Sequence, residues 1–335
     1  MASIRNWALV GSESLMGREL RNLIAESGLP VDLKLIAADS EKAGVLTEHA
    51  GEPALIWGLD EQALRDAHMV FLAGTQESTS QALALTGDAP VLIDLTHAAE
   101  DHPRSFIRAP YVEPPEFRAP EDAVQSIAHP AAIAIALVLP RLHARFPIRR
   151  SLIHIFEPAS ERGMPGVEEL QQQTVSLLSF KSMPKKIFDQ QLSYNMLARY
   201  GEEAPVSLET VELRIERHLA TLLSRAERSA GPAPMPSLRL IQAPVFHGYS
   251  LSLWIEFVDN PGVEAVESAL AGDHVDVRHS DLEPPTSVGM AGQDGIAVGA
   301  VTMDRNAGQA CWCWLAADNL RLAAENAVAV GSQFL

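Results

Sequence analysis

The chain has 335 residues, of which 47% are hydrophobic, and its formal net charge at pH 7 is −17. This length is sufficient for two domains with well-buried cores, and the acidity argues against nucleic acid and anionic membranes as partners. Only two cysteines occur, Cys311 and Cys313, and the apolar run before Gly11 is short. The sequence therefore predicts a cytoplasmic protein without disulfides, signal peptide or membrane span.

The first hundred residues alternate short apolar runs with amphipathic segments. They predict strands and helices in alternation, at 7–11, 15–27, 31–40, 68–74, 77–87 and 91–96. This order of strand, helix and strand is typical of a parallel sheet with right-handed crossovers.

From about residue 148 the pattern changes to long stretches in which apolar and polar residues alternate. Such alternation predicts an antiparallel or mixed sheet, with strands at 149–160 and 237–257. The other predicted segments of this half are helices at 166–178 and 207–229, a proline-rich linker at 230–236, and a last helix at 318–335 that Asp318 caps.

The turn after the first strand reads GSESLMG and places Gly11 and Gly17 between a strand and a helix. Such a turn can hold the pyrophosphate of a dinucleotide on backbone N–H groups at the helix start. The middle glycine of that fingerprint is Ser14 here, and Glu13 adds negative charge where phosphates would lie. A tight turn that binds no ligand is an alternative interpretation.

Asp39 follows the glycine turn by about 20 residues, at the end of the second predicted strand. In a dinucleotide-binding fold such a carboxylate binds ribose hydroxyls and repels a 2′-phosphate, which favours NAD over NADP. A solvated turn residue is the alternative.

The histidines show no H-x(3)-H or H-E-x-x-H spacing, so no metal site is predicted. No G-x-S-x-G elbow supports a serine hydrolase either. On the residues alone, His97, His129 and His247 are interpreted as scattered loop residues, and CWCWL at 311–315 as strand core.

Seven segments, taken in order, resemble the aspartate-β-semialdehyde dehydrogenase family over nearly the whole chain. They are WALVGSESLMG (7–17), FLAG (71–74), LID (92–94), SERGMPGVEELQQQT (160–174), EEAPVSLET (202–210), APVFHGYS (243–250) and DNLRLAAENAV (318–328). The last is similar to the family's D-N-L-R-K-G-A-A-L-N-A-V.

The resemblance implies an α/β protein with two domains. A Rossmann-type dinucleotide-binding domain would comprise 1–130 and 315–335, and a mixed α/β dimerisation domain, like that of glyceraldehyde-3-phosphate dehydrogenase, would comprise 131–314. A bound dinucleotide would contact Gly11, Ser12, Glu13, Ser14, Leu15, Met16, Gly17, Asp39, Ala73, Gly74 and Asn319.

The catalytic cysteine of the family lies in A-N-P-N-C-S-T, where this chain reads AHPAAIA at 128–134. In the family that thiolate attacks an aldehyde or acyl phosphate and holds the substrate as a thioester during hydride transfer. The position falls on Ala132, and its flanking asparagines fall on His129 and Ala131. An alanine methyl group cannot form a covalent intermediate.

The family's other functional positions are altered as well. Its acid/base histidine falls on Tyr249, whose ordinary pKa near 10 is poorly suited to proton transfer at neutral pH. Its active-site glutamine falls on Glu157, and its arginine for the substrate carboxylate falls on Gln242. Its two phosphate-binding residues, a lysine and an arginine, fall on Pro205 and Glu100.

We therefore predict a catalytically inactive relative, a pseudoenzyme of this amino-acid-biosynthesis family, with a binding or regulatory role. The resemblance implies a homodimer, a further protein partner stays open, and NAD is favoured over NADP if either binds. The alternative is an oxidoreductase with altered chemistry that acts on aldehyde or acyl groups with NAD(P). In that case His97, His129, Glu157, His247 and Tyr249 would converge for acid/base catalysis.

Overall fold

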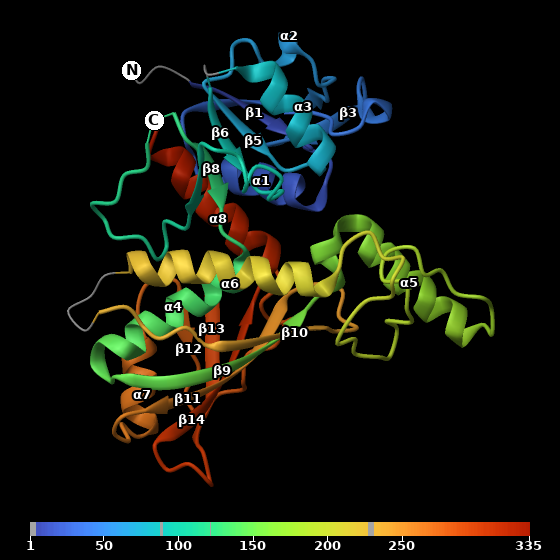
Figure 1. The fold of residues 1–335 in the computed structure, drawn as a ribbon. Coiled ribbons are helices and arrows are strands. Elements are labelled where there is room, and N and C mark those ends of the chain that lie inside the picture. Colours follow the sequence, from blue (N-terminus) through green and yellow to red (C-terminus); the bar gives the residue numbers. More distant parts are fainter. Residues whose placement is uncertain (1–4, 88–89, 121, 227–230) are drawn as a thin grey trace. The chain divides into compact units, whose positions relative to one another are not determined.

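The N-terminal and C-terminal parts of the chain form separate units in the computed structural model (Figure 1). The structure describes residues 5–87, 90–120, 122–226 and 231–335. One unit is Met1–Ala128 together with Ala323–Leu335, and the other is His129–Leu322. None of the described helices is long and apolar enough to cross a membrane.

Six parallel strands form the sheet of the N-terminal unit, which confirms the parallel sheet predicted from the sequence. Their order across the sheet is β2 (Val31–Ile36), β1 (Arg5–Val10), β5 (Met69–Leu72), β6 (Val91–Asp94), β8 (Val124–Ile127) and β7 (Ser105–Arg108). Strand β5 is buried along its whole length, as expected for a central strand of a parallel sheet.

Two of the helices in this unit lie where the sequence predicts them, α1 (Leu15–Glu26) and α3 (Gln76–Thr86). Ser14 and Thr75 cap them by accepting a backbone N–H three residues later. The remaining elements are η1 (Ser40–Lys42), α2 (Glu61–Leu64) and a hairpin of β3 (Leu46–His49) and β4 (Glu52–Leu55). The hairpin residues are all exposed or half-buried, so no apolar alternation signals them in the sequence.

The C-terminal unit contains a mixed six-stranded sheet. The order is β10 (Ser237–Gln242), β9 (Ile148–Glu157), β11 (Tyr249–Phe257), β14 (Ala310–Ala317), β13 (Ile296–Met303) and β12 (Val275–Val277). The two edge pairs are parallel and the inner pairs antiparallel. The stretch 237–257 forms two strands rather than one, because the loop at 243–248 ends β10 before β11 begins.

Helices α4 (Pro130–Arg145), α6 (Leu208–Arg225) and α7 (Val263–Leu270) pack against this sheet (Figure 1). Helix α5 (Gly163–Leu178) follows η2 (Ala159–Arg162) at the end of β9. The predicted end of α6 at 227–229 and the first linker residue, 230, lie outside the described residues. The last helix, α8 (Asn319–Ser332), begins at the predicted cap, because Asp318 Oδ1 accepts the N–H groups of Leu320 and Arg321.

One face of the C-terminal sheet carries large apolar side chains that remain partly exposed. Trp254 on β11 lies opposite Leu152 on β9 and opposite Trp312 on β14. Leu152 and Trp312 are 39% and 37% exposed, whereas their strand neighbours Ile153 and Cys313 are buried. We name Leu152, Trp254 and Trp312 the aromatic face.

The glycine turn of the N-terminal unit is packed too closely for side chains. A Cβ atom on Gly17 would lie 2.0 Å from the carbonyl oxygen of Gly11, and one on Gly11 would lie 2.3 Å from Gly74 Cα. Gly11 also has a φ of +83°, which disfavours any other residue. These glycines therefore let the turns after β1 and β5 contact each other, a role that requires no ligand.

Gly17→Ala should lower the free energy of unfolding by about 2–3 kcal/mol, because its methyl group would overlap backbone atoms that cannot move independently. Urea denaturation measures this loss. The control is Gly58→Ala, whose new Cβ would lie 3.7 Å from Ala43 Cβ in ordinary contact and should change stability by less than about 0.5 kcal/mol. Equal losses in both variants would contradict the packing role.

Candidate functional site

The first turn of α4 carries the position predicted for a nucleophile. Pro130 begins the helix, and Ala131 and Ala132 are fully buried behind it. His129 caps the helix, since its Nδ1 accepts the N–H of Ala131 at 3.3 Å. A helix start of this kind can stabilise a thiolate. Here the first turn carries the methyl group of Ala132 instead, and the side chain of His129 caps the helix.

The capping hydrogen bond determines which nitrogen of the neutral His129 ring carries the proton. Because Nδ1 is the acceptor, the proton of the neutral ring is assigned to Nε2. Nε2 lies 3.6 Å from Glu161 Oε2. The backbone N–H of His129 donates to His218 Nδ1 at 2.9 Å, so α6 also fixes this cap. A buried imidazole is thereby oriented toward a carboxylate.

Glu161 is a residue that the sequence reasoning missed. Burial, followed by the negative charge of Glu157, raises its pKa to about 7. The positive charge of Arg162 and the side-chain hydrogen bonds of Asn319 and Tyr249 act in the opposite direction. Asn319 Nδ2 donates to Glu161 Oε1 at 2.7 Å. The signal was present in SERG at 160–163, which places two charged residues where the resembled family has S-G-A-G.

A continuous polar network extends from Glu161 to the start of α8. Ser160 Oγ donates to Asn319 Oδ1 at 3.2 Å and lies 3.2 Å from His247 Nδ1. His247 Nε2 is 2.8 Å from Asp318 Oδ2. Burial would raise the pKa of Asp318, but the bond and charge of His247, together with the backbone N–H groups of Arg321 and Gly292, outweigh it and lower that pKa. We name this set, with His129, the polar network.

A second buried cluster surrounds Glu157 at the end of β9. Arg162 donates to Glu157 Oε1, and the Tyr200 hydroxyl lies 3.2 Å from the same oxygen and donates to Gln242 Oε1 at 2.5 Å. Burial alone would lower the pKa of Arg162, but Glu157 raises it above its usual value. Gln242 Nε2 donates to the Glu157 carbonyl at 2.8 Å. We name these four residues the glutamate–arginine cluster.

Tyr249 lies between these two groups of residues. Its side chain is 1% exposed, and burial, followed by the charges of Glu161 and Glu157, raises its pKa well above 10. Its ring centroid is 6.1 Å from that of His129. A phenol in this environment keeps its proton at neutral pH and cannot act as the acid/base group that a histidine provides.

The structure brings together most of the predicted residues of the C-terminal unit. His129, Glu157, Gln242, His247, Tyr249 and Asn319 belong to, or contact, the polar network and the glutamate–arginine cluster. Pro205 lies in the loop before α6. His97 and Glu100 belong to the N-terminal unit, in the segment between β6 and β7.

The glycine turn is a poor fit for a pyrophosphate. Ser14 Oγ accepts the N–H of Gly17 at 2.8 Å and donates to the Ala73 carbonyl at 2.6 Å, so the side chain itself occupies one donor of the helix start. Glu13 Oε1 accepts the N–H of Ala38 at 2.9 Å, which fixes a carboxylate in the turn. Ser12 Oγ and Glu13 Oε2 are buried there without a hydrogen-bond partner among the described residues.

Asp39 has a structural role that the sequence also allowed. Its Oδ1 accepts the N–H of Glu41 at 3.0 Å and caps η1. The side chain is largely solvated, as expected for a turn residue. The predicted ribose contact of this carboxylate therefore stays a prediction.

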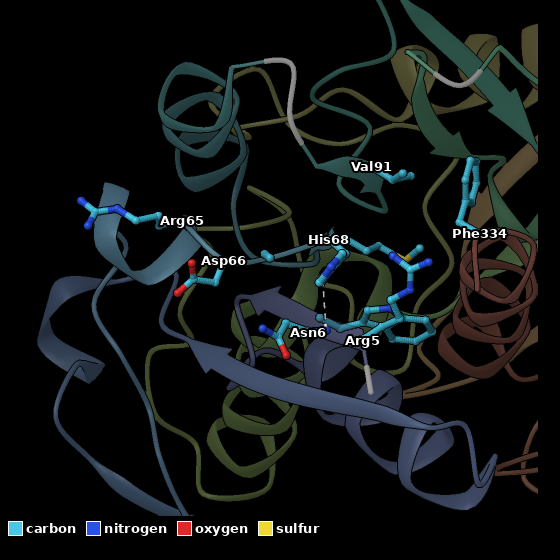
Figure 2. Close-up of a pocket in the computed structure, with 10 residues that line it drawn as sticks. Arg5, Asn6, Arg65, Asp66, His68, Val91 and Phe334 are labelled. Carbon is cyan, nitrogen blue, oxygen red and sulfur yellow. Dashed lines mark hydrogen bonds between the residues drawn. The ribbon is translucent and has the colours of Figure 1, made fainter. Parts of the chain in front are cut away.

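Cavities of the described part of the N-terminal unit include two beside its parallel sheet. One, of about 580 Å³, opens at the amino ends of β1, β5 and β6 (Figure 2). Arg5 and Arg65 both line it, and Figure 2 shows the Arg65 side chain directed away from Phe334. The other, of about 450 Å³, lies beside the glycine turn between α1 and β3. Only the second adjoins predicted site residues.

Known proteins share this architecture. Residues 139–322 match the family "Semialdehyde dehydrogenase, dimerisation domain". The chain is 31% identical to a USG-1 protein homolog of Pseudomonas aeruginosa, over 99% of this chain and 98% of that protein. A probable aspartate-semialdehyde dehydrogenase from Pseudomonas aeruginosa has a similar structure, with a TM-score of 0.84, 27% identity, and coverage of 99% of this chain and 98% of that one.

A more distant structural relative shows the same fold at 14% identity. It is aspartate semialdehyde dehydrogenase with NADP from Candida albicans, with a TM-score of 0.69 over 99% of this chain and 98% of that one. A parallel-sheet unit followed by a mixed-sheet unit thus defines a two-domain α/β protein of the dehydrogenase type. The chain belongs to the aspartate-semialdehyde dehydrogenase family.

The raised pKa of Glu161 has a consequence for stability. Between pH 4.5, the ordinary pKa, and about pH 7, the native protein holds a proton that the unfolded chain has released. Stability should therefore fall as pH rises through this window, by on the order of 1–3 kcal/mol. Glu161→Gln should remove this fall, measured by urea denaturation at pH 5 and pH 8.

The matched control is Glu168→Gln on the exposed side of α5, which should leave the pH dependence of unfolding unchanged. The free energy of unfolding of Glu161→Gln could instead change between pH 5 and pH 8 by as much as that of the native sequence. That result would show that Glu161 is already ionised at pH 5.

Proposed function

We propose that this chain does not catalyse the semialdehyde dehydrogenase reaction and acts as a homodimeric binding or regulatory protein. The observation that carries the proposal is Ala132, fully buried in the first turn of α4. The covalent step of the family requires a nucleophile at that position. Loss of a covalent nucleophile lowers rates by on the order of a millionfold in other enzymes.

The buried groups around this position support the same conclusion. Glu157 is engaged by Arg162 and Tyr200, and Gln242 by Tyr200 and backbone carbonyls. A buried carboxylate is tolerated when it is paired in this way, and the arginine that neutralises it is then not available to bind an anionic substrate. Gln242 has no positive charge to attract a substrate carboxylate. Most polar atoms of these side chains are engaged with one another, although Glu157 Oε2 and Arg162 Nε have no hydrogen-bond partner among the described residues. This mutual engagement supports a role in structure rather than in turnover.

Homodimer formation is supported by the match to the dimerisation domain over residues 139–322. Leu152, Trp254 and Trp312 of the aromatic face are adjacent across three strands. Large apolar side chains that are exposed together commonly mark a protein–protein interface. We propose that two copies of the chain pack through this face.

Acid/base chemistry without a covalent step is the second candidate function. It is favoured by the pairing of His129 with Glu161, whose pKa near 7 suits proton transfer at neutral pH. The substrates would be aldehyde or acyl compounds, and NAD(P) would be the cofactor, as in the oxidoreductase alternative that the sequence leaves open. Glu161→Gln would abolish such an activity and leave dimerisation unchanged, which separates this candidate from a binding role.

The purified protein should not reduce NAD or NADP with aspartate semialdehyde and phosphate, even at tens of micromolar protein. Absorbance of the reduced nicotinamide measures this, with an active family member as positive control. Ala132→Cys alone should also remain inactive, because Tyr249 and Glu157 still replace the acid/base and polarising groups. Turnover by the unaltered chain would contradict the proposal.

Leu152→Asp and Trp312→Asp should each weaken the homodimer by at least about tenfold, because a charge would be buried in an apolar contact. Sedimentation velocity at several concentrations measures the dissociation. Leu213→Asp on the exposed side of α6 is the matched control and should leave the dimer intact. Dimers of unchanged strength in all three variants would place the interface elsewhere.

A further inference from the structure

Ser160, His247 and Asp318, three members of the polar network, come from separate segments of the C-terminal unit. Ser160 lies in η2, His247 in the loop between β10 and β11, and Asp318 directly before α8. Ser160 Oγ is 3.2 Å from His247 Nδ1, and His247 Nε2 is 2.8 Å from Asp318 Oδ2. Contacts in this order are those of a nucleophile, a general base and the carboxylate that orients the base.

Asp318 determines which nitrogen of His247 can accept a proton. Its Oδ1 accepts two N–H groups at the start of α8, and its Oδ2 accepts the N–H of Gly292 at 2.8 Å. These donors favour the ionised carboxylate, which accepts the proton of His247 Nε2 and leaves the lone pair of Nδ1 facing Ser160. Serine proteases use the two imidazole nitrogens the other way round, and either nitrogen can accept a proton.

Hydrogen bonds of the backbone hold the serine against the loop that carries the histidine. The N–H of Ser160 donates to the Phe246 carbonyl at 3.0 Å. Asn319 Oδ1 accepts the N–H of Gly248 at 3.1 Å, which joins the same loop to the start of α8. The three segments are therefore positioned relative to one another before a substrate binds, as catalysis by orientation requires.

The start of α5 lies directly against the segment of Ser160. Helix α5 begins at Gly163 and has no side-chain cap. A Cβ atom on Gly166, in its first turn, would lie 2.4 Å from the Ala159 carbonyl oxygen of η2. N–H groups in the first turn of an uncapped helix can stabilise the oxyanion that forms when a hydroxyl adds to a carbonyl.

Exposure and charge limit which substrates can react here. Ser160 is 3% exposed, whereas the imidazole of His247 is 31% exposed. A substrate would therefore approach along the edge of the imidazole, and only a small acyl group would fit against the hydroxyl.

The arginines nearest to these residues in the sequence are committed to carboxylates. Arg162 donates to Glu157, and Arg321 Nε donates to Asp294 Oδ1 at 2.6 Å. Since these guanidinium groups are engaged, they are not available to bind a substrate carboxylate. The site therefore favours an uncharged acyl group.

We propose that Ser160, His247 and Asp318 form a catalytic triad that hydrolyses small, uncharged esters. His247 Nδ1 takes the proton of the Ser160 hydroxyl while Oγ bonds to the ester carbonyl carbon. Collapse of the tetrahedral intermediate breaks the bond to the alcohol, which leaves with the proton from His247. Water, deprotonated by His247 in turn, attacks the acyl–serine and releases the carboxylic acid and the free hydroxyl. This activity requires neither a dinucleotide nor a nucleophile at position 132.

Labelling of the full-length protein with a fluorophosphonate, which bonds to activated serines with loss of fluoride, tests the triad. Intact mass spectrometry should show one label on the native chain, and peptide mapping should place it on Ser160. Ser160→Ala should abolish the labelling, and His247→Gln should slow it by at least about a hundredfold, the usual contribution of a general base. Hydrolysis of p-nitrophenyl acetate, a small uncharged ester, should fall in parallel.

Ser151→Ala is the matched control, because Ser151 is 4% exposed in the same unit and its hydroxyl has no hydrogen-bond partner among the described residues. This variant should be labelled, and should hydrolyse the ester, as the native sequence does. Urea denaturation shows whether each variant is folded. Ser160→Ala deletes a single oxygen atom, so it keeps the test valid if His247→Gln does not fold.

Three results would overturn the proposal: no labelling of the native chain, a label that maps to a residue other than Ser160, or equal rates in the native sequence and Ser160→Ala. Dehydrogenase activity and the strength of the homodimer are measured separately. Failure of the triad would therefore leave the proposed binding or regulatory role unaffected.

Discussion

The buried ion pair between Glu157 and Arg162 is the interaction on which the C-terminal unit depends. Glu157 ends β9 with its side chain fully buried, and an unpaired carboxylate there would be strongly destabilising. Arg162 balances this charge through the turn η2, which brings the guanidinium back within five residues. The pairing also positions Glu161, because it is the residue next to Arg162 in the same turn.

The two substitutions, Glu157 and Arg162, are physically linked. An arginine at 162 supplies the charge that a glutamate at 157 requires, and the Tyr200 hydroxyl lies 3.2 Å from the same carboxylate oxygen. Among the described residues, Glu157 Oε2 has no hydrogen-bond partner. Removal of one partner of such a pair costs about 3–5 kcal/mol. Charges that stabilise one another in this way are committed to each other, so this arginine is not available to a substrate.

The fold was predictable because two signals were strong. Buried parallel strands appear as continuous apolar runs, and the segment DNLRLAAENAV combines the Asp318 cap with a helical pattern. The hairpin at 46–55 was not predictable, since its side chains are largely solvated. At the candidate site, substitutions such as Ala132 were visible one by one, whereas the pairing of His129 with Glu161 depends on two segments far apart in the chain.

The basic cavity beside the glycine turn was hidden in the sequence for a similar reason. Arg18 and Arg21 read as the polar side of an amphipathic helix, and only the path of η1 and β3 brings Lys42 and Thr47 opposite them. Helical patterns indicate which residues face solvent, but not which solvated residues share a cavity. The C-terminal unit thus contains buried ion pairs, whereas the cations of this cavity are exposed or half-buried.

Intact mass spectrometry tests the central claim, loss of the covalent step, most directly. The protein is incubated with aspartate semialdehyde and NADP, with and without phosphate, and its mass is recorded before and after reduction of any trapped adduct. The account predicts an unchanged mass, because Ala132 cannot bond to the substrate and Cys311 and Cys313 are buried. A stoichiometric adduct on any side chain of the C-terminal unit would contradict it.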